Sequence, residues 1–416
     1  MLEEILNREN MTQAFKRVKS NKGVAGIDGM TVEQLQPYLS SAWVFLKAEI
    51  LEGNYKPASV KQVTIPKPDG GERNLGVPTV VDRLIQQAIS QRLQELYEAG
   101  FSESSYGFRP HRNAHQAVRK AQRYLNEGNT YVIELDVEKF FDRVNHDHLM
   151  NLLSRKIQDK RVLHLIRSYL TSGIMIGGIA IPRDKGTPQG SPLSPLLSNI
   201  VLDELDKELE KRGHKFVRYA DDCSIYVRSR KAAERVKESI TRYLETHLFL
   251  RVNREKTKIS LPHQSTILGF SFYRDKDGYQ LRIAPKSLKR IKEKLRPITG
   301  RKYPLPLSAR LLTLVPLIRG WVNYFKIAKA KQHMQEMDEW VRTRLRMCIW
   351  KQWKRIRTRI RELMELGVNQ MKAIQWGLTS LGYCRVSHSP ILQSTLTNEY
   401  FTRQGYVSFA NVYLNQ

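Results

Sequence analysis

The chain has 416 residues, of which 41% are hydrophobic, a composition typical of a globular protein with about two to four domains and not of a disordered or fibrous chain. Its 69 Lys and Arg outnumber its 41 Asp and Glu, which gives a net charge of +28. That excess is larger than solubility requires. It indicates a polyanionic partner, nucleic acid above all, and a merely basic surface is the alternative.

The spacing of the cysteines and the N-terminal sequence indicate the cellular compartment in which the protein is expected. Cys223, Cys348 and Cys384 form no CxxC pair, which argues against a disulfide framework and against a zinc module. The stretch "MLEEILNREN" is acidic and amphipathic, unlike a signal peptide, and no segment has the roughly 18 uninterrupted apolar residues of a membrane helix. We therefore expect a soluble protein of a reducing cytoplasm with no membrane partner.

The first part of the chain predicts helices around one hairpin. Apolar residues at helical spacing indicate a helix over residues 2–18 that ends at the glycine-rich loop "NKGVAGIDG". Strands at 60–65 and 73–77, joined by the turn "KPDGG", form a basic hairpin. A long amphipathic helix then runs from Thr79 to near Gly100.

The middle of the chain predicts alternating strands and helices. Asp136 interrupts one strand pattern, and Asp221 and Asp222 stand at the bend between the last two. The order favours a ferredoxin-like antiparallel sheet with helices on one face. In order, the expected elements are a helix at 112–126, a strand at 131–137, a helix at 146–170, a strand at 173–181, a helix after "GTPQGSP", and strands at 215–219 and 223–227.

The chain changes character at Pro285. Residues 285–361 hold 22 Lys and Arg against 4 Asp and Glu, interleaved with tryptophans and with apolar residues at helical spacing. This pattern predicts helices with one packed face and basic faces that neutralise phosphates. We expect most of the tryptophans to pack in the helical core, and stacking on bases is the alternative.

Aspartates within apolar strand patterns need an explanation, because burying an unpaired carboxylate is costly. A polar turn is the structural alternative, but here apolar runs flank Asp221 and Asp222 on both sides. Carboxylates on neighbouring strands suit two divalent cations roughly 3.5–4 Å apart, which activate a hydroxyl and stabilise a leaving pyrophosphate. The cations also offset the repulsion among the carboxylates.

Ordered blocks of the sequence resemble those of reverse transcriptases. Together with "NKGVAGIDGMT" and "LIRGWVNYF", they resemble the proteins encoded by bacterial group II introns over residues 10–385. After "GYCRVSHSPILQSTL" the sequence shows no paired cysteines, so we expect no Cys/His-bearing endonuclease module, and this ending resembles the class C branch of that family. The other blocks are "IPKPDGGERNLGVPTVVDRLIQQAI", "SSYGFRPHRNAHQAV", "ELDVEKFFDRVNHDHL", "GTPQGSPLSPLLSNIVLDELD", "RYADDCSIYV", "LRVNREKTKI" and "ILGFSF".

The resemblance implies an α+β fold of the right-hand polymerase type. Its expected parts are an N-terminal extension with fingers at 1–130, a ferredoxin-like palm at 131–284, a helical thumb at 285–365 and a small C-terminal DNA-binding domain at 366–416. The implied activity is that of an RNA-directed DNA polymerase, which extends a DNA primer with dNTPs on an RNA template. The implied cofactor is a pair of Mg2+ ions, for which Mn2+ can substitute.

Further partners follow from the same resemblance. They are the group II intron RNA, which the protein would bind to assist splicing and retrohoming, and target DNA, in the bacterial cytoplasm. After Ile283 the sequence offers no further strand-borne set of carboxylates, so we expect no ribonuclease H module. Two rival hypotheses are a polymerase-inactive, RNA-binding maturase and a domesticated reverse transcriptase in DNA repair or phage defence.

Roles at the acidic site carry over by position. Asp136 and Asp221 resemble the two metal-bridging carboxylates, Asp222 resembles a third and less direct acid, and Val137 completes the metal set. Tyr219 and Ala220 would form the close approach to the primer end.

Roles at the nucleotide also carry over. Phe141, or Phe140 as the alternative, resembles the bulky residue that excludes a 2'-hydroxyl, and a plain core phenylalanine is the structural explanation. Ser191 stands where many relatives have glycine. Lys67 and Arg73 suit the triphosphate, and a solvated hairpin is their alternative. The residues expected near the nucleotide are Lys67, Arg73, Phe141, Gln189, Gly190 and Lys256.

The template backbone is expected to contact Arg109, Arg112 and Asn113 in "GFRPHRNAH", since Arg and Asn are common phosphate donors. A structural role at a helix start is the alternative for this segment.

Overall fold

The computed structural model describes residues 1–66, 70–176, 179–181 and 184–415 and divides into two compact units, Met1–Ser265 and Thr266–Gln416. The helices of the first unit are α1 (Leu2–Ile5), α2 (Arg8–Ser20), α3 (Leu35–Glu52), α4 (Val80–Glu98), α5 (Ala114–Asn126), α6 (Phe140–Arg143), α7 (His146–Ser154), α8 (Lys160–Thr171), α9 (Ser194–Lys211) and α10 (Arg230–Thr246). Its strands are β1 (Val60–Pro66), β2 (Glu72–Val77), β3 (Tyr131–Leu135), β4 (Ile174–Ile176), β5 (Ile179–Ile181), β6 (Lys215–Tyr219), β7 (Asp222–Val227) and β8 (Lys258–Ser260).

Two long helices expected from the sequence are each broken in two. The helix expected over 2–18 forms α1 and α2, because the Asn7 side chain accepts a hydrogen bond from the Asn10 N–H and starts a new helix. The helix expected over 146–170 forms α7 and α8, and Asp159 caps the second in the same way. Local capping therefore overrides the continuous apolar spacing.

One sheet of the first unit contains the expected basic hairpin, with strand order β2-β1-β4-β5. β1 and β2 pair antiparallel, as predicted, and β4 joins β1 in parallel. The prediction that the strand at 173–181 belongs to the ferredoxin-like sheet is wrong, since it forms β4 and β5 here. A short apolar run does not specify its sheet, whereas the Val60 N–H bond to the Gly173 carbonyl, at 2.7 Å, ties it to β1.

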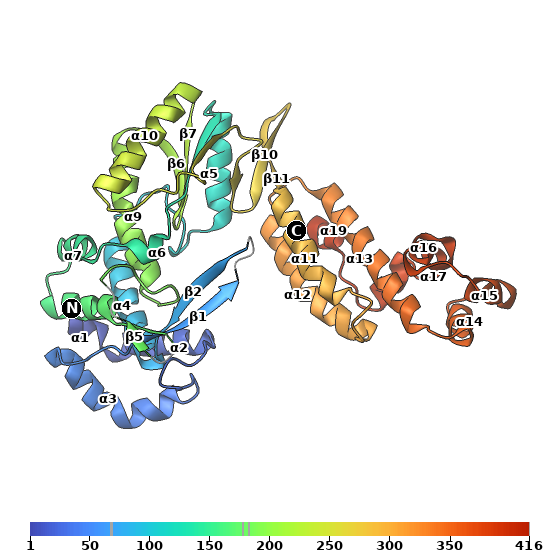
Figure 1. Cartoon of the computed structure of the whole chain (residues 1–416), viewed down its shortest axis with the longest axis horizontal. Helices are drawn as coiled ribbons and strands as arrows, with labels where there is room; N and C mark the ends of the chain where they lie inside the picture. Colours follow the sequence, from blue (N-terminus) through green and yellow to red (C-terminus); the bar gives the residue numbers. More distant parts are fainter. Residues whose placement is uncertain (67–69, 177–178, 182–183, 416) are drawn as a thin grey trace. The chain divides into compact units, whose positions relative to one another are not determined.

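The second sheet of the first unit has the order β6-β7-β3-β8. Residues Ile133 and Ile225 face α9 and α10, whereas Tyr226 faces α5, with its ring 5.7 Å from that of Tyr124. The prediction of helices on one face is thus corrected: α10 and α9 lie on one side of this sheet and α5 lies against β6 and β7 on the other (Figure 1). After Asp222, the residues on both faces of β7 are buried, so helices cover both faces.

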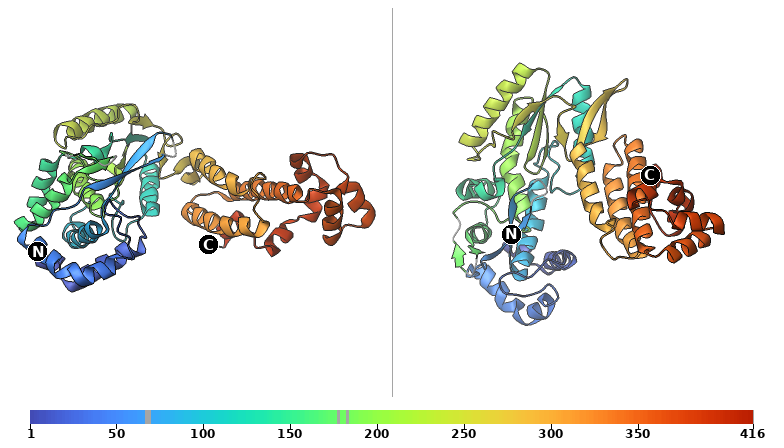
Figure 2. Two further views of the ribbon diagram at one scale, coloured as in Figure 1. Left: turned by 60° about the horizontal axis from the view of Figure 1, so that its bottom comes forward. Right: turned by 45° about the vertical axis from the view of Figure 1, so that its right-hand side comes forward.

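The second unit begins with a small sheet of order β11-β10-β9 and continues as helices (Figure 2). The Phe270 ring of the sheet packs 4.9 Å from that of Phe325, so this sheet, which falls within the segment 131–284 expected as palm, groups with the helices that follow it. Its elements are β9 (Thr266–Ile267), β10 (Phe270–Asp275), β11 (Gly278–Ile283), α11 (Pro285–Ile298), α12 (Leu307–Phe325), α13 (Lys331–Gln352), α14 (Ile356–Glu365), α15 (Gln370–Gly377), α16 (Tyr383–His388), α17 (Pro390–Thr395), α18 (Asn398–Arg403) and α19 (Phe409–Leu414).

A buried aspartate anchors the C-terminal helix. Asp338 of α13 is 2% exposed and accepts hydrogen bonds from the hydroxyls of Tyr406 and Ser408, both at 2.7 Å, and from the N–H groups of Phe409 and Ala410, both at 2.9 Å. These bonds hold α19 against α12 and α13. Within the described part of the chain, no helix combines the length and apolarity needed to cross a membrane.

Candidate functional site

Strand pairing brings the two acidic segments to one edge of the sheet. β3 and β7 are antiparallel neighbours, with Leu135 opposite Cys223, so the end of β3 lies beside the start of β7. Asp136 directly follows β3, Asp222 is the first residue of β7, and Asp221 lies in the two-residue turn before it. Residues more than eighty positions apart thus meet, as their expected roles require.

The side-chain alternation of the strands selects which acids share a face. Asp222 and Ser224 point to the same face of β7, and Glu134 is directly opposite Ser224. Burial of the carboxyl group, and then the negative charges of Asp221, Asp136 and Glu134, raise the pKa of Asp222 to about 6. Glu134 was missed in the sequence reasoning, although its two-residue spacing from Asp136 in a strand pattern was the signal for it.

A basic loop lies against this acidic edge. The Asn253 N–H donates to the Asp136 carbonyl at 2.8 Å, and the Asp136 N–H donates to the Thr257 hydroxyl at 3.1 Å. Lys256, between them, places Nζ 3.9 Å from Oδ2 of Asp136 and is itself exposed. Lys258 Nζ lies 3.4 Å from Oε2 of Glu134. The exposed Lys256 ammonium therefore lies beside the Asp136 carboxylate, at the acidic edge of the sheet.

The acidic cluster suits hard divalent cations. Oxygen donors are what Mg2+, Mn2+ and Ca2+ prefer. The pKa of Asp222 is raised by burial first and then by the neighbouring carboxylates, whose negative charge a cation would compensate. Among the described residues no group of three or more acidic, His or Cys side chains is arranged so that it could hold a metal ion by itself. Val137 lies opposite Val252 in an isolated antiparallel bridge. The two backbone hydrogen bonds beside it are accepted by the carbonyls of Asp136 and Arg251, and neither of them uses the Val137 carbonyl.

The loop before α9 docks closely on the basic hairpin. The Gly76 N–H of β2 donates to the Gln189 carbonyl at 2.6 Å. Gly190 has φ +109°, and a Cβ there would lie 2.7 Å from the Gly76 carbonyl oxygen, so both glycines are needed for this contact. Ser191 is buried and donates its hydroxyl to Gln86.

Solvent exposure differs between Arg73 of the hairpin and the two candidate phenylalanines. Arg73 is exposed on β2, opposite Ile65, whereas Lys67 lies outside the described residues. Phe140 is 2% exposed, and Phe141 is half-buried with its carbonyl accepting the Thr187 N–H at 2.6 Å. Phe141 is thus the more accessible of the two candidates for a contact with a sugar.

The segment expected at the template is mainly structural. The Arg109 side chain is 2% exposed, and its guanidinium donates to Glu98 and to the Ser102 and Ser105 carbonyls. This burial corrects the expectation that Arg109 contacts template phosphates. Asn113 caps α5 in a reciprocal capping box with Gln116.

Arg112 keeps part of its surface accessible. Its guanidinium pairs with Glu103, whose Oε2 lies 2.6 Å from Nη2, and the Arg112 side chain is 23% exposed. At the acidic turn, Tyr219 is half-buried and Ala220 is 8% exposed.

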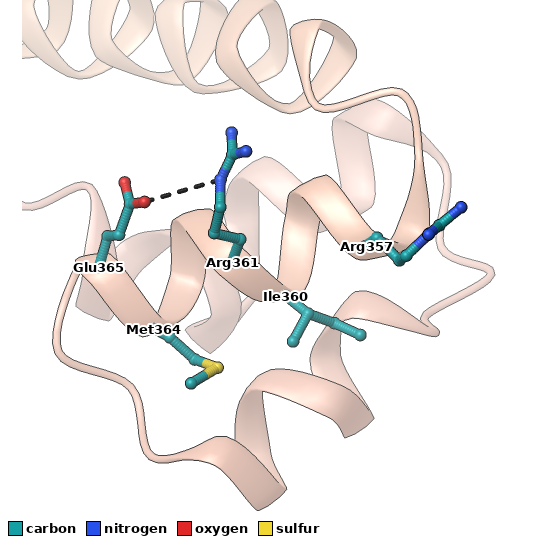
Figure 3. Close-up of a pocket in the computed structure, with 5 residues that line it drawn as sticks. All are labelled: Arg357, Ile360, Arg361, Met364 and Glu365. Atoms are coloured by element: carbon teal, nitrogen blue, oxygen red, sulfur yellow. Dashed lines mark ion pairs between the residues drawn. The ribbon is translucent and has the colours of Figure 1, made fainter.

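The second unit combines packed tryptophans with basic surface. Trp350 and Trp353 are buried, whereas Trp321 and Trp340 are half-buried. The Lys292 ammonium lies 5.8 Å and the Arg344 guanidinium 5.0 Å from the centre of the Trp340 ring. On α14, Ile360 and Met364 line a shallow hollow together with Arg357, Arg361 and Glu365, and Arg361 Nε lies 3.6 Å from Oε1 of Glu365 (Figure 3).

Two protein families match this chain in order. The family described as "Reverse transcriptase (RNA-dependent DNA polymerase)" matches residues 65–272, and "Group II intron, maturase-specific domain" matches residues 288–367. These ranges include the acidic cluster and the basic helices, respectively.

Individual relatives and one solved structure are similar over different shares of the chain. Protein YkfC of Escherichia coli is 34% identical over 312 residues, which cover 65% of this chain and 81% of YkfC. The group II intron-encoded protein LtrA of Lactococcus lactis is 28% identical over 395 residues, 77% of this chain and 62% of LtrA, so less than two thirds of LtrA is covered. A partial Cas6-RT-Cas1–Cas2 complex matches with 28% identity and a TM-score of 0.38, over 59% of this chain and 42% of that chain.

Proposed function

The chain belongs to the reverse transcriptase family and carries a group II intron maturase-specific domain, and from this premise we propose that it extends a DNA primer with dNTPs on an RNA template. The observation that carries the proposal is the meeting of Asp136, Asp221 and Asp222 at one sheet edge, within the region that the family match covers. A divalent metal is general for this family, and two Mg2+ ions, with Mn2+ as a substitute, are the proposed cofactor.

The proposed mechanism assigns each carboxylate a task. Asp136 and Asp221 would hold both cations, Asp222 would complete the cluster, and the Val137 carbonyl would serve as a backbone ligand. When bound, the cations supply the charge that activates the primer 3'-hydroxyl and stabilises the pyrophosphate. Tyr219 and Ala220 would seat the primer end next to these acids.

The nucleotide would be bound by cations and by the loop before α9. Arg73 is exposed on the hairpin and Lys256 is exposed beside Asp136, which supports a role for both cations in binding the triphosphate. Lys67 is proposed for the same role by family resemblance. Gln189 and Gly190 would contact the base pair from the docked loop, and Phe141 would exclude a 2'-hydroxyl.

The basic helices support a second, linked function. We infer that residues 285–365 act as a thumb that binds the primer–template and the intron RNA to assist splicing and retrohoming, and that residues 366–416 contact target DNA. Residues 1–130 would form the N-terminal extension and fingers, and residues 131–284 would form the palm. The half-buried Trp340 with Lys292 and Arg344 near its ring, and the charge excess of this segment, support the RNA-binding part. The bacterial cytoplasm is the proposed location, as a bacterial intron protein would require.

Primer extension on poly(rA)/oligo(dT) tests the proposal. The full-length protein should incorporate dTTP with Mg2+, and Asp221→Ala should reduce incorporation by about 1000-fold or more, because one cation ligand is lost. Asp147→Ala, which changes an aspartate whose side chain is 83% exposed, is the matched control and should keep full activity. A folded wild-type protein without incorporation would support the polymerase-inactive maturase instead.

A further inference from the structure

The turn that carries Asp221 has an unusual backbone. Ala220, the first of its two turn residues, has φ +57°. Two-residue hairpin turns with positive φ favour Gly, Asn or Asp, and the Cβ of an alanine makes this backbone conformation strained. The surrounding structure must therefore hold this turn in place.

The turn is held by a fully buried arginine. Arg218 Nε donates to Oδ1 of Asp206 at 2.7 Å and Nη2 donates to Oδ2, and both side chains are 0% exposed. Arg218 Nη1 also donates to the Ala220 carbonyl and to Oδ1 of Asn199, both at 2.9 Å. The guanidinium thus connects the backbone of the turn to two side chains of α9.

A second backbone segment packs directly on the turn. A Cβ on Gly107 would lie 2.2 Å from the Ala220 nitrogen, so only glycine fits. The Asn199 side-chain amide donates to the Gly107 carbonyl at 2.9 Å. The segment is tied to β6 by the Arg218 N–H bond to the Ser104 carbonyl, at 2.8 Å. Asn199 therefore bonds to both Arg218 and the segment that covers the turn.

We propose that Arg218, Asp206 and Asn199 are positioning residues for polymerisation, which lock the turn at Ala220 and so fix the Asp221 carboxylate relative to Asp136. The inference rests on the proposed function. It also assigns a use to a buried ion pair, which by itself is weak support for stability because desolvation offsets the attraction. α9 begins at Ser194, just after the loop that contains Gln189 and Gly190. The same helix therefore connects the turn at Ala220 to the loop that is proposed to contact the nucleotide.

The choice of variants separates positioning from folding. Arg218→Ala would leave Asp206 buried and unpaired and would destabilise the fold, so a loss of rate in this variant could not be assigned to positioning. Arg218→Lys keeps the charge and loses the forked donor geometry, and Asn199→Ala keeps both charges. The matched control is Ser198→Ala. Ser198 is a buried residue of α9 whose hydroxyl donates to the Ser194 carbonyl at 2.7 Å, and it is not one of the three residues proposed to lock the turn, which together are called the lock.

Three measurements on the full-length protein test the lock. They are the single-turnover rate of dTTP addition on poly(rA)/oligo(dT), the affinity for Mn2+ without nucleic acid, from the electron paramagnetic resonance of unbound Mn2+, and Tm. Asn199→Ala and Arg218→Lys should lower the rate by about 10- to 100-fold, because a small misplacement of a catalytic group has that effect. They should also weaken Mn2+ binding, whereas Ser198→Ala should keep both values with a Tm close to that of Asn199→Ala.

The outcomes decide between positioning and plain stability. Rate and Mn2+ affinity retained in both folded lock variants would overturn the proposal, as would equal losses in Asn199→Ala and Ser198→Ala. If the wild-type protein adds no dTTP, the proposed function fails, but the Mn2+ affinities of the wild type and Asn199→Ala still show whether the lock orders the carboxylates.

Discussion

Asp222→Asn should stabilise the metal-free protein at pH values above 6. Burial, followed by the charges of Asp221 and Asp136, raises the pKa of Asp222 from 3.8 to about 6. Because the folded state then binds the proton more tightly than the unfolded chain, this carboxyl stabilises the protein below pH 3.8, and that contribution is lost as the pH rises to about 6. For a shielded group the shift corresponds to about 3 kcal/mol. Although the carboxyl is enclosed enough for burial to raise its pKa, the Asp222 residue as a whole is exposed to solvent, so about 1 kcal/mol is the appropriate magnitude after screening.

Thermal unfolding in EDTA, followed between pH 4 and pH 8, measures this effect. Asp222→Asn should raise Tm by about 2–4 °C at the alkaline end and converge on the wild type at the acidic end. Asp147→Asn, which changes an exposed aspartate of the same unit, is the control and should leave Tm close to that of the wild type. Millimolar Mg2+ should stabilise the wild type more than Asp222→Asn, because the cation binds the ionised cluster. A lower Tm for Asp222→Asn at pH 8 in EDTA would refute the electrostatic reasoning.

Three other substitutions test separate parts of the structure. Asp338→Ala should destabilise the second unit by about 3 kcal/mol or more, because four donors in 406–410 lose their buried acceptor; unchanged hydrogen exchange of α19 would contradict this. Phe141→Ala should raise ribonucleotide incorporation relative to dNTPs by about tenfold or more, whereas Phe140→Ala should mainly lower Tm, and equal discrimination in the Phe141 variant and the wild type would count against the steric role. Gly190→Ala should raise KM for dNTPs, since its φ of +109° and the nearby β2 carbonyl leave no room for a Cβ; normal dNTP kinetics would show that the docked loop is not needed at the nucleotide.

Local patterns were sufficient for the elements that depend on neighbouring residues. Alternating apolar residues and a glycine turn predicted the β1–β2 hairpin, and helical spacing predicted α4, within two residues of the observed bounds. The same patterns failed where a side chain caps the backbone, as at Asn7 and Asp159, because one hydrogen bond ends a helix without changing the apolar spacing. The strand at 173–181 failed for another reason, since its partner β1 lies more than a hundred residues away in the chain.

Burial distinguishes residues that residue type alone left equivalent. Arg109 and Arg73 are the same residue type in similar family blocks, yet Arg109 is enclosed by Glu98 and backbone carbonyls while Arg73 is exposed. A buried guanidinium whose donors are already used has no surface left for a phosphate. Phe140 and Phe141 are separated in the same way, by exposure and not by sequence context.

The sequence by itself determined the nucleic-acid partner class, through net charge, and the candidate acids, through carboxylates in apolar strands and their resemblance to a family. Only the tertiary structure decided that Glu134 joins Asp136 and Asp222 on one face, and that Arg218 and α9 hold the turn before Asp222. The physical reason is that periodicity reports which way a side chain points along its own strand or helix. Which charges it then meets, and how much water remains around it, depend on pairing between segments far apart in the chain.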